Sequence, residues 1–177
     1  MPSYNFGKDK VCEWIREHFP ADAEVLDVGA CDGNMHQWLP EYKNMDAVEI
    51  WTPSAEAIKP LYREVFNANM VGLKIKKYDL IIMGDFIEHL SVEDAQKVIK
   101  YCKTRCTDMV VAVPFLYPQG EMYGNPYEEH LQPDLTAEVF AERYPGFEVL
   151  LDTGMNYCYY HKAPTPTKKR VAKNETR

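Results

Sequence analysis

A short segment containing an acid and two glycines gives the first chemical signal in the sequence. Residues 25–34 read Val-Leu-Asp-Val-Gly-Ala-Cys-Asp-Gly-Asn, so Asp27 closes an apolar stretch, and Gly29 and Gly33 follow it. Glycine lacks a Cβ, and a glycine-containing turn at a helix entrance therefore lets backbone amides approach a ligand closely. Asp27 suits a ligand that presents an ammonium or sulfonium group, because opposite charges attract.

The same turn argues against a dinucleotide. A dinucleotide-binding turn has the pattern GxGxxG, with the pyrophosphate on the helix N-terminus, but Cys31 and Asn34 occupy two of the glycine positions. Asp27 would also set negative charge beside the phosphates. A nicotinamide-dependent oxidoreductase is therefore disfavoured.

The segment from Asp27 to Gly33 resembles the first motif of the class I S-adenosylmethionine-dependent methyltransferases, an acid followed by glycines at alternating positions. It departs from that motif only at Cys31, where a small residue still fits the turn. The resemblance implies S-adenosyl-L-methionine as cofactor, with S-adenosyl-L-homocysteine as product. In this turn it implies cofactor contacts from Asp27, Gly29, Ala30, Cys31 and Gly33.

Three further segments extend the resemblance in the family's order, over most of residues 23–115. Glu49 ends the second predicted strand, where the family uses an acid to accept hydrogen bonds from the ribose hydroxyls. The remaining implied contacts lie beside the adenine (Ile50, Trp51, Asn67, Ala68) and beside the methionine part (Asp85, Phe86). Each residue also has an ordinary structural interpretation: Asp27 as a helix cap, Glu49 as a solvated strand end, and Trp51 as a core residue.

Two residues after the fourth predicted strand are candidates for proton transfer. Glu88 and His89 belong to a Glu-His-Leu tripeptide that small-molecule methyltransferases often carry at this place. Histidine titrates near neutral pH, and ligands of doubly wound folds bind at the carboxyl edge of the sheet, so His89 is the candidate base. The alternative is that both residues brace the following helix.

The loop Tyr117–Pro133 follows the fifth predicted strand at the same edge, and loops of this length are usually functional. Its polar and aromatic groups suit a sugar or glycan hydroxyl, and the candidate substrate-binding residues are Glu121, Tyr123, Asn125, Tyr127, Glu128 and His130. The alternative is a packed surface lid. His130 beside Glu128 and Glu129 is too weak a signal for a metal site, and none is predicted.

These residues need a particular scaffold, and helical and strand patterns alternate along the chain as that scaffold requires. The predicted fold is α/β: a doubly wound, Rossmann-like methyltransferase sheet, mainly parallel with an antiparallel C-terminal hairpin strand. Helices are predicted near 11–19, 35–39, from 52, 91–106 and 136–143. Strands are predicted at 24–28, 45–50, 62–66, 78–83, 109–113, 148–151 and 157–161.

Composition restricts the class of protein. The 177 residues, 46% of them hydrophobic, suit one domain, which we place at residues 1–163, with a disordered basic tail at 164–177. A net charge of -7 makes nucleic acid an unlikely partner. Five scattered cysteines indicate reduced thiols in a cytoplasmic protein, and no apolar run predicts membrane insertion.

The predicted function is therefore transfer of a methyl group from S-adenosyl-L-methionine to the oxygen or nitrogen of a small polar molecule or glycan. The partner is that acceptor, and the sequence is compatible with a homodimer. The alternative is a catalytically inactive cofactor-binding subunit or scaffold of a methyltransferase complex. Turnover with an acceptor distinguishes the two.

Overall fold

The computed structural model describes residues 5–163, and the predicted basic tail at 164–177 lies outside them. One seven-stranded sheet organises this part of the chain, in the order β3-β2-β1-β4-β5-β7-β6. The first five strands in sequence are parallel, whereas β7 runs antiparallel to both β5 and β6. The strands are β1 (Val25–Val28), β2 (Met45–Glu49), β3 (Glu64–Asn67), β4 (Tyr78–Gly84), β5 (Cys106–Pro114), β6 (Phe147–Asp152) and β7 (Tyr157–Lys162).

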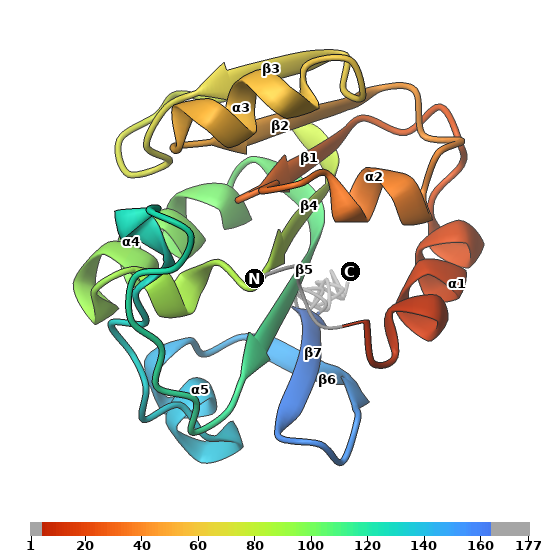
Figure 1. Ribbon diagram of the computed structural model, residues 1–177. Helices are drawn as coiled ribbons and strands as arrows, with labels where there is room; N and C mark the ends of the chain where they lie inside the picture. The colour runs from red at the N-terminus through yellow and green to blue at the C-terminus, as the bar shows by residue number, and fades with distance from the viewer. Residues whose placement is uncertain (1–4, 164–177) are drawn as a thin grey trace, which may run out of the picture.

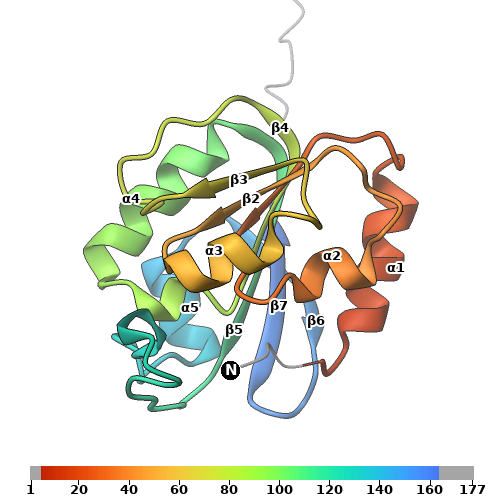
Figure 2. The same ribbon diagram turned by 45° about the horizontal axis from the view of Figure 1, so that its top comes forward.

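Helices cover both faces of this sheet (Figures 1 and 2). The first three helices pack on one face: α1 (Lys8–His18), α2 (Asn34–Trp38) and α3 (Thr52–Ile58). The other face carries α4 (Val92–Lys103) and α5 (Ala137–Arg143). Two 3-10 turns, η1 (Ile87–His89) and η2 (Pro126–Glu128), complete the list. Among the described residues, no helix combines the length and the apolar character needed to cross a membrane.

The central strands are buried on both sides, which explains their continuous apolar runs. Alternate side chains of β1 enter two separate cores: Leu26 packs with the α4 and α5 side, and Val25 with the α1 side. Because the helices hold the sheet from both faces, the carboxyl ends of the parallel strands keep fixed positions. Most of the predicted cofactor-binding residues lie at or just after those ends.

The predicted fold class is confirmed, including the antiparallel pair at the C-terminus. Most element boundaries differ from the prediction by one to three residues, and two of these differences are informative. The third strand begins at Glu64 rather than Tyr62, because the Tyr62 ring turns inward and its hydroxyl donates a hydrogen bond to Asp27. The fourth helix ends at Lys103 rather than at residue 106, and Cys106 begins β5.

A cluster of ion pairs holds the amino ends of the strands together. Asp46, fully buried on β2, accepts two hydrogen bonds from Arg63, at 2.6 and 2.7 Å. Arg63 also donates to Glu24, at 2.7 and 2.9 Å. Burial opposes ionisation of Asp46, but the hydrogen bonds from Arg63, Tyr78 and Lys76 outweigh it and lower the pKa of Asp46. Arg63 therefore compensates a buried charge.

We expect Arg63→Met to destabilise the protein by about 2 to 4 kcal/mol, because the Asp46 carboxylate would remain buried without its main partner. Urea unfolding at pH 7 measures the change. Lys59→Met is the matched control: Lys59 is half exposed and pairs only with the exposed Glu56, so it should change stability by less than about 0.5 kcal/mol. Equal effects of the two substitutions would contradict this assignment.

Candidate active site

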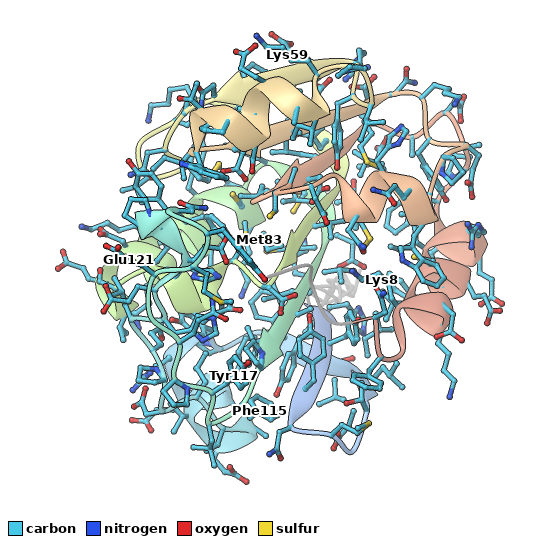
Figure 3. The ribbon with its side chains drawn as sticks, viewed as in Figure 1. Lys8, Lys59, Met83, Phe115, Tyr117 and Glu121 are labelled. Atoms are coloured by element: carbon cyan, nitrogen blue, oxygen red, sulfur yellow. The ribbon has the colours of Figure 1, made fainter. Side chains whose placement is uncertain are left out.

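A large cavity opens at the carboxyl edge of the sheet, where β1 and β4 lie side by side. The connections from these two strands leave toward opposite faces of the sheet, so this edge is a topological switch point, where ligands bind in doubly wound folds. The cavity measures about 200 Å³. Lys8 and Tyr117, labelled in Figure 3, reach it from α1 and from the loop after β5.

The glycine turn after β1 lines the cavity through Gly29, Ala30 and Cys31, three of the residues for which the sequence predicts cofactor contacts. A Cβ on Gly29 would lie 2.9 Å from the Phe86 ring, so only glycine allows the two strand ends to approach this closely. Cys31 has a φ of 48°, in the left-handed region. This conformation explains why the resembling family places glycine there, and Cys31 adopts it at some strain.

Asp27 lies at the end of β1, 4% exposed, and accepts a 2.6 Å hydrogen bond from the Tyr62 hydroxyl. Burial raises the pKa of Asp27 to about 6, against the opposing effects of Tyr62 and Lys8. Asp85 sits across the cavity with a φ of 50°, and its backbone amide donates to Ala112 on β5. Two acids therefore face the same space.

Lys8 is a cavity residue that the sequence did not reveal. It is 4% exposed and its ammonium donates to the Asn34 side chain over 2.5 Å. Burial lowers the pKa of Lys8, while Asp85 and Asp27 act in the opposite direction. Its position on the helix could have indicated burial: Lys8 shares a helix face with the buried Val11 and Ile15, an unusual place for lysine.

Glu49 ties the first two strands together at this edge. Its carboxylate accepts a 3.0 Å hydrogen bond from the Cys31 amide and a 2.7 Å hydrogen bond from the Trp51 amide. It is 6% exposed and lines the cavity, and burial raises the pKa of Glu49. Both carboxylate oxygens retain lone pairs that can accept from a ligand.

The predicted adenine-side residues divide into two groups. Ile50 and Ala68 line the cavity, and so does Asn69, which was not predicted. Asn67 does not: its amide donates to the carbonyls of Glu49 and Ile50 and so braces the end of β2. Two other predicted cofactor contacts do not line the main cavity either. Gly33 of the glycine turn packs against Leu61 and Ile58, and Trp51 lines a smaller neighbouring cavity.

The loop after β5 is fixed to η1 by one buried glutamine. Gln132, 2% exposed, donates to the carbonyls of Ile87 and Leu90, and its own backbone amide donates to the Glu88 carbonyl. No pattern in the sequence marked Gln132 for this role. Its contacts bring His130 edge-to-face against His89, with ring centroids 4.7 Å apart.

Four of the six predicted substrate-binding residues line the main cavity: Asn125, Tyr127, Glu128 and His130. Glu121 is exposed and lies outside it, and Tyr123, 75% exposed, borders the smaller cavity instead (Figure 3). Both candidate catalytic residues, Glu88 and His89, are at the main cavity as well. Tyr157 and Tyr159 of β7 close its far wall.

No protein-family model matches the chain, and no curated protein does. Solved structures match it over nearly its whole length. An S-adenosylmethionine-dependent methyltransferase from Clostridium acetobutylicum ATCC 824 is 14% identical, with a TM-score of 0.67 over 92% of this chain and 93% of that one. A TehB-like SAM-dependent methyltransferase from Corynebacterium glutamicum ATCC 13032 Kitasato is also 14% identical, with a TM-score of 0.65 over 92% and 89%.

The N-terminal domain of EvdMO1, solved in the presence of SAH and D-fucose, is 13% identical. Its TM-score is 0.64 over 92% of this chain and 84% of that one. Likeness at these identities establishes the fold. The chain therefore has the Rossmann-like fold of the class I S-adenosylmethionine-dependent methyltransferases.

We expect Tyr62→Phe to raise the pKa of Asp27 above about 6, because it removes the hydrogen bond that favours the carboxylate. An aspartate has a pKa near 3.9 when unfolded, so its raised pKa in the folded state makes stability fall as pH rises from about 4 through 6. In the variant this fall should extend to higher pH. Carboxyl ¹³C NMR of Asp27, with urea unfolding at several pH values, measures both effects.

Tyr42→Phe is the control, since it deletes another buried hydroxyl, one that donates to the carbonyls of Ile15 and Phe19. It should leave the Asp27 titration unchanged. Identical Asp27 titrations in wild type and Tyr62→Phe would show that the tyrosine does not influence this carboxylate.

Proposed function

We propose that this chain transfers the methyl group of S-adenosyl-L-methionine to the oxygen or nitrogen of a small polar acceptor, with a sugar or glycan hydroxyl as the favoured group. The observation that carries the proposal is the convergence of the Asp27–Cys31 turn and Glu49 on one cavity at the switch point of the sheet. Neither the turn nor Glu49 defines the ligand by itself. Together they suit a nucleoside that bears a positively charged chain.

The cavity residues fit this cofactor. Gly29 leaves space that any Cβ would fill, and Glu49 offers buried acceptor oxygens to a ribose. Asp27 and Asp85 supply negative charge for the sulfonium and ammonium groups, while Lys8 can pair with the methionine carboxylate. Ile50 and Ala68 offer apolar surface for the adenine.

When bound, the cofactor supplies a methyl group on a positively charged sulfur, and the protein's contribution is to position the acceptor against it and to handle the acceptor's proton. Glu88, His89 and His130 lie in the cavity wall, on the side of the loop after β5. Tyr127 and Asn125 extend this polar wall. We assign the acceptor to this side and the cofactor to the side of Asp27 and Glu49.

Two kinds of support favour a small polar acceptor. The loop side of the cavity combines amide, carboxylate, imidazole and phenol groups, which hydrogen-bond hydroxyls and stack on sugar faces. Among proteins of the same fold, the EvdMO1 domain was solved with D-fucose present. The net charge of -7 disfavours a nucleic-acid backbone.

Calorimetric titration of the purified protein tests the cofactor. We expect S-adenosyl-L-methionine and S-adenosyl-L-homocysteine to bind one per chain, and NAD not to bind. Methyl transfer to a panel of sugars and nucleotide-sugars, followed as S-adenosyl-L-homocysteine formed, then tests the acceptor class. Absence of binding by either sulfur compound would overturn the proposal, and binding without turnover on any acceptor would favour the inactive subunit.

Glu49→Gln should weaken S-adenosyl-L-homocysteine binding about 5-fold to 100-fold, because hydrogen bonds to a charged group contribute about 1 to 3 kcal/mol. The isosteric amide preserves size, so folding should persist, which circular dichroism checks. Glu64→Gln, an exposed glutamate on the adjacent β3, is the matched control and should bind like wild type. Unchanged affinity in folded Glu49→Gln protein would remove Glu49 from the site.

A further inference from the structure

Three potential metal ligands meet in the cavity wall, contributed by two segments about forty residues apart. One ligand atom each from Glu88, His89 and His130 lies within 4.8 Å of the other two. The first two residues belong to η1, and His130 comes from the loop after β5. The sequence paired His130 with Glu128 and Glu129 as metal ligands and predicted no site, because it could not show that the loop returns to η1.

The hydrogen bonds of both histidines leave one ring nitrogen of each ready to bind a metal. Nδ1 of His89 lies 3.2 Å from the Glu129 carbonyl, and Nδ1 of His130 lies 2.7 Å from the Tyr117 carbonyl. A carbonyl only accepts, so each Nδ1 carries the proton and each Nε2 keeps its lone pair. Metal-binding histidines are oriented in this way, with the other ring nitrogen donating to a carbonyl or carboxylate.

Glu88 supplies the observation that points to a ligand. Its side chain is fully buried, lines the cavity, and accepts no hydrogen bond at either carboxylate oxygen from another residue in the described part of the chain. An unpaired buried carboxylate is strongly unfavourable, whereas a bound cation would compensate it. The two imidazole nitrogens that could share this cation lie beside it.

We propose that Glu88, His89 and His130 bind one divalent transition-metal ion, of the Zn²⁺, Mn²⁺ or Co²⁺ class, in the wall of the cavity. Two imidazoles favour these ions over Mg²⁺ and Ca²⁺, which prefer oxygen ligands throughout. Three protein ligands leave coordination positions open for water or for an oxygen of the acceptor, as in catalytic rather than structural sites.

The use of this ion rests on the proposed function. An acceptor hydroxyl bound to the ion becomes more acidic, as a metal-bound water does. Its proton leaves to solvent, and the oxygen lone pair forms the new bond to the methyl carbon. The carbon–sulfur bond breaks in the same step and its electron pair stays on sulfur, which gives S-adenosyl-L-homocysteine and the methyl ether. His89 then acts as a ligand that orients the ion rather than as the base.

Cobalt titration of the full chain, stripped with a chelator and freed of any purification tag, tests the site without a cofactor. We expect one Co²⁺ per chain, visible as d–d absorption and by calorimetry. His89→Asn and His130→Asn should each weaken binding at least tenfold, as should Glu88→Gln. His18→Asn, an exposed histidine that contacts Trp14 on α1, should leave Co²⁺ binding unchanged.

Two results would overturn the site: no saturable Co²⁺ binding, or binding that is equal in wild type and in both folded histidine variants. Zn²⁺-induced shifts of the His89 and His130 ring signals, observed by NMR of the wild-type protein, give a second reading that needs no variant. Unchanged ring signals at saturating Zn²⁺ would also overturn it.

The metal site and the proposed function can be disproved by separate experiments. S-adenosyl-L-homocysteine binding to metal-free protein tests the cofactor, and Co²⁺ binding without cofactor tests the metal site. Once an acceptor is found, a chelator should reduce turnover at least tenfold and Mn²⁺ or Co²⁺ should restore it. Full turnover in chelator would overturn the role in acceptor activation.

Discussion

The cavity depends on the hydrogen bonds that the Glu49 carboxylate accepts. Glu49 lies at the end of β2, and its carboxylate accepts hydrogen bonds from backbone amides in the turn after β1 and at the entrance to α3. The turn carries Cys31 in a left-handed conformation, which is unfavourable for a residue with a Cβ. The Glu49 hydrogen bond helps to hold this conformation. A single buried acid therefore helps to shape this side of the cavity and also lines it with acceptor oxygens.

Burial of several acids around one space gives the cavity an electrostatic character that favours cations. Burial raises the pKa of Asp27, Glu49 and Glu88, so each carboxyl is less easily ionised than it would be in water. Lys8 is the buried ammonium that faces Asp27 and Asp85. A cationic ligand beside Asp27 and a metal ion beside Glu88 would each stabilise the ionised carboxylate, which burial otherwise disfavours.

The strand ends that line the Asp27 side of the cavity could be located from the sequence because their determinants are local. Asp27, Gly29 and Glu49 sit at strand ends that the apolar runs mark directly, and the parallel order of the sheet brings those ends together. Tyr62 and Gln132 could not be predicted, since their roles consist of hydrogen bonds to residues 35 to 45 positions away. The loop side of the cavity is built from such long-range contacts, and for that reason the sequence did not bring Glu88, His89 and His130 together.

The base and the tip of the loop after β5 differ in their contacts. At its base, Gln132 and the backbone amide of Leu131 donate hydrogen bonds to carbonyls of η1. The Gln119 side chain also donates to the Glu128 carbonyl, which joins the two sides of the loop. Its tip at Tyr123 is exposed, with left-handed backbone, and borders a smaller cavity that shares Asn125 and Glu128 with the main one. On the proposed function, substitutions at the tip should therefore alter the choice of acceptor without moving His130.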